Sequence, residues 1–244
     1  MKSLIICPVG NPITFLPSEY SPKYHWRRIN LVEREYETLI VVYNDDFIPE
    51  SDSFDHVLQM KGHKWQIIKN VPNFFDVTKY DYIGCVDDDL VTDIQSFNRG
   101  IELAREHDFK LWQLSMVKGS GIIYDCLKQN KEWSFSETNF VEMGSTFFRQ
   151  DMFHKAVDFF KKVDFKVGWG LDKVFCDVLQ CKANVVHEAS IYHPPNTIKP
   201  SYYDQREAMI EMNHMIQNVY PKILGNTWRF TDVQSTLRVW KKDQ

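Results

Sequence analysis

Apolar runs of strand length alternate with segments of helical spacing along the first half of the chain. Four runs rich in apolar or β-branched residues fit strands, most of them buried on both faces of a sheet: 3–7, 38–43, 56–60 and 82–86. Helices are predicted around them at 24–36, 64–75 and 93–107, the last with Asp93 as N-cap. This order predicts an α/β fold with a central, mostly parallel sheet flanked by helices.

The second half of the chain is less regular. Strands are predicted at 111–114, 144–148 and 184–193. Helices are predicted at 152–163, with Asp151 as N-cap, and at 203–219. Pro8 begins a predicted loop after the first strand, and the tail from Gly225 onward is short, polar and aromatic. Repeats and linkers are not evident, so one domain over residues 1–244 is expected.

Composition narrows the class of protein. Hydrophobic residues make up 43% and charged residues 25% of the 244 residues, which is ordinary for a globular domain. The formal net charge of −4 gives no basic field, so nucleic acid is not an expected partner. The chain has no apolar run of about 20 residues that could span a membrane. Its first apolar run is too short for a signal peptide.

The cysteines and the aromatic residues say less about the class of protein. An odd number of cysteines without a Cys-x-x-Cys pair indicates free thiols and a reducing, cytoplasmic location: Cys7, Cys85, Cys126, Cys176 and Cys181. Aromatic residues reach 14%, which fits either sugar-binding surfaces or an aromatic core.

The strongest candidate for chemistry is the acidic triplet Asp87-Asp88-Asp89, directly after the apolar run 82–86. Ligands of open parallel sheets bind at the carboxyl ends of strands. Three adjacent carboxylates there repel one another, and a divalent cation offsets that repulsion. Oxygen ligands of this kind suit Mg²⁺ or Mn²⁺ bound together with substrate phosphates. An acidic loop at a helix N-terminus is the alternative interpretation.

A second candidate is the segment Gly168-Trp169-Gly170-Leu171-Asp172. Its two glycines allow a tight turn that leaves the Trp169 indole exposed or packed on a ligand. Asp172 would then stand at the start of a helix, where its carboxylate could take a proton from a sugar hydroxyl as general base. The alternative is that Asp172 only caps that helix.

Two late histidines, His187 and His193, lie on one face of the chain if this segment is extended. Neutral imidazole is a common ligand of transition metals, although a lone histidine is more often structural.

These motifs, in this order, resemble those of GT-A glycosyltransferases. The resemblance extends over about residues 60–195 and is closer to the plant-type glycosyltransferase family formerly labelled a domain of unknown function. The landmarks that carry it are Lys64-Trp65, Tyr80-Asp81-Tyr82 before the acidic triplet, Phe140-Val141-Glu142, Gly168-Trp169-Gly170-Leu171-Asp172, and Val185-Val186 separated by six residues from His193. His187 departs from the family pattern, which tends to have an acid there.

The resemblance implies a role for each matching residue. Asp172 would be the catalytic base, and Asp89 and His193 would ligate Mn²⁺ or Mg²⁺, with Asp87 on the metal-bound diphosphate or the ribose. The donor would also contact Asp88 and Lys64, and the acceptor Trp169 and Glu142. The nucleotide base would lie near Pro8, Asn11 and Asp45.

The implied activity is transfer of a sugar from a nucleoside diphosphate sugar to a hydroxyl of a glycan or lipid-linked acceptor, with inversion. Residues 1–110 would bind the donor, 111–225 the acceptor, and 226–244 form the tail. Trp228, Trp240 and nearby basic residues could rest this tail on an anionic membrane, although packing against the domain is the alternative. Two other functions stay open: a haloacid-dehalogenase-type phosphatase, with Asp87 as nucleophile and Asp89 as acid, and a non-catalytic carbohydrate- or nucleotide-binding module.

Overall fold

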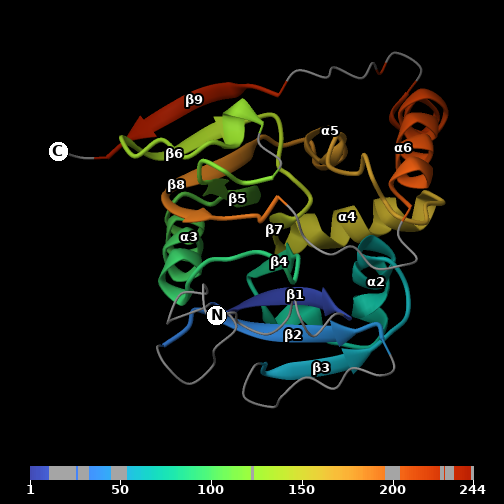
Figure 1. Ribbon diagram of the computed structural model, residues 1–244, viewed down its shortest axis with the longest axis horizontal. Coiled ribbons are helices and arrows are strands. Elements are labelled where there is room, and N and C mark those ends of the chain that lie inside the picture. Colours follow the sequence, from blue (N-terminus) through green and yellow to red (C-terminus); the bar gives the residue numbers. More distant parts are fainter. Residues whose placement is uncertain are drawn as a thin grey trace.

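In the computed structural model, the described residues form a mixed nine-stranded sheet in the order β3-β2-β1-β4-β7-β5-β8-β6-β9. The structure describes residues 1–10, 26, 33–44, 54–121, 124–195, 204–225, 228 and 234–242. Figure 1 shows β3 at one edge of the sheet and β9 at the other. The predicted α/β class with helices around one sheet is confirmed.

Parallel strands from the first half of the chain form one side of the sheet. They are β1 (Ser3–Val9), β2 (Tyr36–Val42), β3 (His56–Gln59) and β4 (Tyr82–Val86). β4 matches its predicted bounds, and β1 and β2 are buried at nearly every position, as a strand covered on both faces should be. The predicted helix at 24–36 lies mostly outside the described residues, and its last residue, Tyr36, begins β2 instead.

Strands of the second half continue the sheet from β4. They are β5 (Leu111–Met116), β6 (Trp133–Thr138), β7 (Ser145–Arg149), β8 (Ala183–Ile191) and β9 (Thr236–Lys241). Among the described strands, only β6 and β7 run against the direction of the others, since each is antiparallel to both of its neighbours. The predicted strands at 111–114, 144–148 and 184–193 correspond to β5, β7 and β8, whereas β6 and β9 were not predicted.

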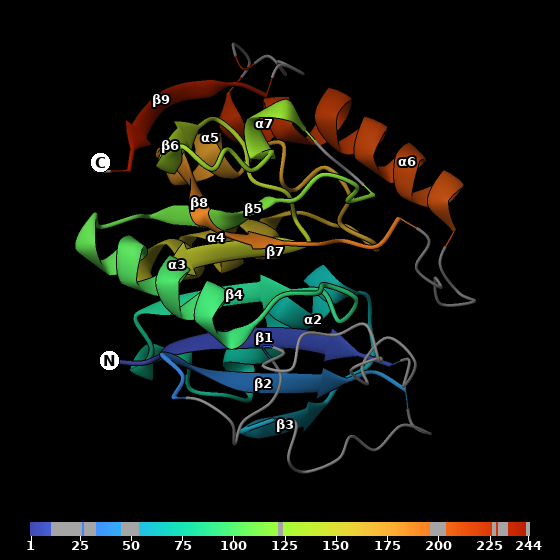
Figure 2. The same cartoon turned by 60° about the vertical axis from the view of Figure 1, so that its left-hand side comes forward.

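Helices cover both faces of this sheet (Figure 2). They are α2 (Lys64–Asn70), α3 (Ile94–Glu106), α4 (Gln150–Lys162), α5 (Phe175–Leu179), α6 (Gln205–His214) and α7 (Tyr220–Leu224), with a π-helical turn, η5 (Met215–Val219), between the last two. Short 3-10 turns are η2 (Val71–Asn73), η3 (Val77–Lys79) and η4 (Asp125–Leu127). No described helix has the length and apolar character that a membrane span requires.

The predicted helix caps have different outcomes. Asp93 caps α3, with its carboxylate accepting a hydrogen bond from the backbone N–H of Ser96 at 2.7 Å. The prediction of Asp151 as the cap of α4 is wrong, because that helix begins earlier, after Arg149. Asp151 lies in the first turn, where its carboxylate accepts a hydrogen bond from Arg149 Nε at 2.7 Å.

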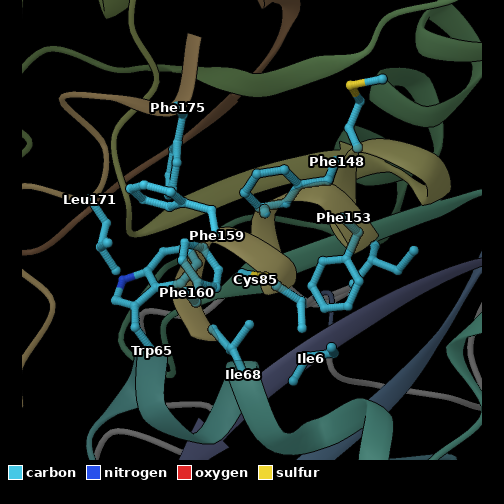
Figure 3. Packing of buried hydrophobic residues seen from close by; sticks show 14 of the residues in the cluster. Ile6, Trp65, Ile68, Cys85, Phe148, Phe153, Phe159, Phe160, Leu171 and Phe175 are labelled. Carbon is cyan, nitrogen blue, oxygen red and sulfur yellow. The ribbon is translucent and has the colours of Figure 1, made fainter. Parts of the chain in front are cut away.

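Alternating side chains of the strands point into two separate hydrophobic cores, one on each face of the sheet. Leu4 and Ile6 of β1 point to one face, and Ile5 and Cys7 point to the other. The first core packs aromatic side chains of α2, α4 and α5 against the sheet, including Trp65, Phe160 and Phe175 (Figure 3). The second core is also rich in aromatic residues, among them Trp26, Phe97 and Trp112, so both cores account for much of the aromatic excess of the sequence. The five predicted free thiols are confirmed, and three of them are buried.

The tail returns to the sheet through β9, which pairs with β6. Trp240 stacks on Phe135 of β6 with ring centroids 4.5 Å apart. The described part of the tail therefore packs against the domain, while Leu237 and Val239 stay exposed on the edge strand.

Candidate active site

Parallel strands β1, β2 and β4 end at one edge of the sheet, and the acidic triplet follows β4 there. Asn44, after β2, donates a side-chain hydrogen bond to the carbonyl of Gly10, after β1, at 3.1 Å. The predicted loop at Pro8 is wrong, because Pro8 lies buried within β1 opposite Val41 of β2. Asn11 and Asp45 lie outside the described residues.

Asp87 forms an ion pair with Lys64, the first residue of α2. The Nζ–Oδ1 distance is 2.7 Å, and the same ammonium donates a hydrogen bond to the Met143 carbonyl at 2.6 Å. Burial lowers the pKa of Lys64, but the adjacent Asp87 carboxylate outweighs it and raises this pKa above its ordinary value. Lys64 therefore stays charged and holds α2 against the end of β4.

Glu142 brings a further carboxylate to this edge, from the connection between β6 and β7. It is 6% exposed and accepts a hydrogen bond from the Gly144 N–H at 2.8 Å. Burial, with the nearby Asp87 carboxylate, raises its pKa above the ordinary range. A Cβ atom on Gly144 would lie 2.6 Å from Glu142 Oε2 and 3.1 Å from Asp87 Oδ2, so the two carboxylates leave no room for a side chain.

Asp89 and His193 meet beyond the end of β4. The His193 Nε2 atom lies 3.4 Å from Asp89 Oδ2, and both side chains are largely buried. Paired backbone hydrogen bonds between Val91 and Tyr192, each 2.9 Å long, hold the two segments together. Burial lowers the pKa of His193, but Asp89 and then Asp87 raise it above its ordinary value. Asp88, between the two other acids, is half-buried.

The Asp89–His193 pair fits a shared divalent cation. Two ligands of one octahedral ion lie about 3 Å apart when each is about 2.1 Å from the metal, close to the separation found here. The other histidine nitrogen, Nδ1, is buried without a hydrogen-bond partner among the described residues. Those residues contain no cluster of three His, Cys, Asp or Glu side chains arranged for a metal.

His187, by contrast, is a structural residue. Its Nε2 lies 2.9 Å from Ser136 Oγ, and its Nδ1 accepts a hydrogen bond from the Asn130 N–H at 3.2 Å. Burial lowers its pKa to about 4, so the ring is neutral.

The Gly-Trp-Gly segment forms the predicted tight turn. Gly168 and Gly170 both have a φ of +89°, a conformation that other residues rarely adopt. Trp169 between them is half-buried. Asp172 follows, but α5 begins only at Phe175 with Val174 as its N-cap, so the alternative that Asp172 caps this helix is wrong.

Asp172 occupies an environment suited to proton transfer. Only 8% of the residue is exposed, and burial raises its pKa to about 7, with Glu142 adding to the effect and Lys173 opposing it. A base works best when its pKa lies near the working pH, because it is then both available and strong enough to accept a proton.

Two aromatic rings lie against Lys173, the residue after Asp172, and sequence reasoning gave neither of them a functional role. Lys173 places its ammonium 4.6 Å from the ring centroid of Tyr124 and 4.9 Å from that of Phe140. Phe140 belongs to a family landmark, whereas Tyr124 has no local signal, because only the fold brings it to Lys173.

Solved structures share this architecture. The complex of S. aureus TarS 1–349 with UDP-GlcNAc has a TM-score of 0.55 and 14% identity, over 89% of this chain and 67% of that one. TarS 1–349 alone has a TM-score of 0.53 and 16% identity, and its complex with UDP has a TM-score of 0.52 and 15% identity. Each of these two matches covers 89% of this chain and 66% of the TarS chain. TarS is a glycosyltransferase. This chain has a glycosyltransferase-like fold.

The likeness lies in fold more than in sequence, and the chain spans about two thirds of the TarS 1–349 length. No protein-family model and no curated protein sequence matches it. The resemblance to a GT-A fold is thereby supported, and the plant-type family stays a prediction.

The raised pKa of Asp172 predicts a pH-dependent stability. The folded state holds this proton up to about pH 7, whereas the ordinary value is 3.8, so the free energy of unfolding should fall as pH rises between these values. Asp172→Asn has no carboxyl at this position to ionise, so it should not show this fall in the free energy of unfolding. It should be more stable than wild type by about 2 kcal/mol or more at pH 8, whereas at pH 4 this advantage should be absent. Urea unfolding across this pH range measures it, with exposed Asp158→Asn as control. Parallel curves for wild type and Asp172→Asn would contradict the assigned environment.

Proposed function

We propose that this protein is a metal-dependent glycosyltransferase that moves a sugar from a nucleoside diphosphate sugar to a hydroxyl of a glycan or lipid-linked acceptor. The observation that carries the proposal is the pairing of the strand-end acids Asp87 and Asp89 with Lys64 and His193, in a fold similar to TarS. The buried carboxylate of Asp172 is coupled to this group through Glu142. A binding module would have no need for a buried carboxylate with a pKa near neutrality.

The donor is proposed to bind at the carboxyl edge of β1, β2 and β4. Lys64 would stabilise the negative diphosphate, since the ion pair with Asp87 places its ammonium at the end of β4. Asp89 and His193 would hold Mn²⁺ or Mg²⁺, which when bound neutralises charge on the departing diphosphate. Asp87 and Asp88 would complete the contacts to the donor.

Asp172 is proposed to accept the proton of the acceptor hydroxyl. The hydroxyl oxygen then attacks the anomeric carbon from the side opposite the diphosphate, so the configuration inverts. Trp169 and Glu142 would orient the acceptor, the first through its ring face and the second through hydrogen bonds. Once the hydroxyl proton has moved to Asp172, the carboxyl becomes neutral, as suits its buried position.

The proposal is tested by incubating the protein with UDP-GlcNAc and Mn²⁺ and measuring release of UDP. Slow hydrolysis by water is expected without an acceptor, because Asp172 can activate water as it would a sugar hydroxyl. A parallel assay with p-nitrophenyl phosphate addresses the phosphatase alternative. Phosphate release there, without turnover of any nucleotide sugar, would overturn the proposal.

Replacement of the base should affect the chemical step alone. Asp172→Asn keeps the size of the side chain but cannot take a proton, so kcat should fall by about a hundredfold or more. The Kd for UDP with Mn²⁺, measured by calorimetry, should stay within about threefold of wild type. Near-normal turnover by this variant would show that Asp172 is not the base.

Replacement of the proposed metal ligand should affect binding. Asp89→Asn weakens the attraction for a cation, so Mn²⁺ should no longer strengthen UDP binding, whereas metal-free binding should change little. Calorimetry with and without Mn²⁺ measures this difference. The exposed Asp125→Asn serves as control, and an unchanged Mn²⁺ effect in Asp89→Asn would contradict the assignment.

Contact of the tail with an anionic membrane stays a prediction for the exposed side chains of β9. Leu237 and Val239 are alternate residues and so project from one face of the edge strand, where they could enter a lipid interface. The double variant Leu237→Ser with Val239→Ser should lose cosedimentation with phosphatidylserine vesicles. Equal sedimentation of variant and wild type would exclude this face from membrane contact.

A further inference from the structure

One carboxylate of α6 accepts hydrogen bonds from the backbone at the start of the Gly-Trp-Gly turn. Glu211 accepts hydrogen bonds from three consecutive N–H groups, those of Lys166 at 2.5 Å, Val167 at 3.1 Å and Gly168 at 2.6 Å. Charge-assisted bonds of this kind are stronger than neutral ones. The proposed function leaves this cluster without a role.

Further contacts of the same helical segment hold the other end of the turn. The Tyr220 hydroxyl donates a hydrogen bond to the Gly170 carbonyl at 3.1 Å, and Tyr220 is fully buried. A Cβ atom on Gly170 would lie 2.8 Å from Met212 Cγ, so α6 packs directly on the turn. The turn is thus held on both sides of Trp169.

The turn is held against α2 as well. A Cβ atom on Gly168 would lie 3.0 Å from side-chain atoms of both Leu171 and Trp65. Leu171 and Trp65 both belong to the core beneath the turn (Figure 3). Asp172 directly follows Leu171, so the position of its carboxylate depends on a turn clamped between α2 and α6.

We infer that Glu211 is a positioning residue, which through the backbone of residues 166–168 holds Asp172 in its buried, reactive position. The inference rests on the proposed role of Asp172 as base. It assigns to α6, which supplies none of the proposed site residues, a direct part in setting the rate of transfer.

The position matters because it determines how much water reaches Asp172. If the turn loosens, water enters and the pKa of Asp172 moves down toward its ordinary value. The ionisable groups that surround Asp172 are Glu142, Lys173, Tyr124 and Tyr220. The charge of Glu211 acts on Tyr220, whose hydroxyl stays neutral throughout the titration because burial raises its pKa. Glu211 is not among the main causes of the raised pKa of Asp172, so a shift in this pKa reports on the turn.

The test compares Glu211→Gln with Glu207→Gln, one turn earlier on α6. The control carries the same chemical change, but Glu207 pairs with the exposed Lys166 ammonium at 2.9 Å and makes none of the backbone contacts. Carbon-13 NMR titration of the Asp172 carboxyl measures its pKa, and hydrolysis of UDP-GlcNAc with Mn²⁺ measures kcat over the same pH range.

In Glu211→Gln the pKa of Asp172 should fall by about one unit, and kcat by about tenfold or more, since small displacements of a catalytic group are costly. The Kd for UDP with Mn²⁺ should stay within about twofold, and Glu207→Gln should behave as wild type. A fraction of globally unfolded molecules would lower kcat without moving the Asp172 pKa of the molecules that stay folded. An unmoved pKa in Glu211→Gln, or an equal shift in Glu207→Gln, would overturn the inference.

Tyr220→Phe provides a second route if Glu211→Gln does not fold. It removes only the hydroxyl that donates a hydrogen bond to the Gly170 carbonyl, and it should lower the pKa of Asp172 by less than Glu211→Gln does. An unchanged pKa of Asp172 would contradict the role of these contacts in holding the turn. If the wild type hydrolyses no nucleotide sugar, the proposed function fails, but the titration still decides whether the clamp sets the environment of Asp172.

Discussion

Repulsion among the buried and half-buried carboxylates at the end of β4 is the constraint on which the site depends. Asp87, Asp89 and Glu142 meet there, and Glu142 also acts on Asp172. Opposing positive charges come from different parts of the chain. Lys64 begins α2, and His193 follows β8, so the start of a helix and the end of a strand must both lie close to the end of β4. Removal of one partner from a buried ion pair leaves the other uncompensated, which typically costs about 3–5 kcal/mol. The negative charge that remains is suited to a divalent cation with phosphate oxygens.

Features that depend only on a few consecutive residues could be predicted from the sequence. The run that forms β4 is apolar because both faces of the strand are buried, so its end and the following acids were placed correctly. Gly168 and Gly170 signalled a tight turn because positive φ angles favour glycine. Pro8 was misplaced in a loop. At Pro8 the strand pairs with β2 alone, because its pairing with β4 ends at Ile6, so the proline lies where the strand has only one neighbour.

Features that depend on distant parts of the chain could not be predicted. The Lys64–Asp87 pair joins residues 23 positions apart through the packing of α2 on the sheet. β9 exposes nearly all of its side chains, so it lacks the alternation that marks a half-buried strand. The raised pKa of Asp172 follows from burial, and a local motif does not encode how much protein surrounds a carboxylate. The contacts of Glu211 in α6 and Tyr220 in α7 with the Gly-Trp-Gly turn explain how a loop residue comes to be so enclosed.

The central claim is that a nucleoside diphosphate and a divalent cation bind together at the end of β4. A crystal structure with UDP and Mn²⁺ tests it most directly, since manganese is located by its anomalous scattering. The account predicts a single peak within about 2.3 Å of both the Asp89 carboxylate and the His193 imidazole, with oxygens of the diphosphate in the same coordination shell. A manganese ion and nucleotide bound elsewhere, with the Asp89–His193 pair undisturbed, would contradict it.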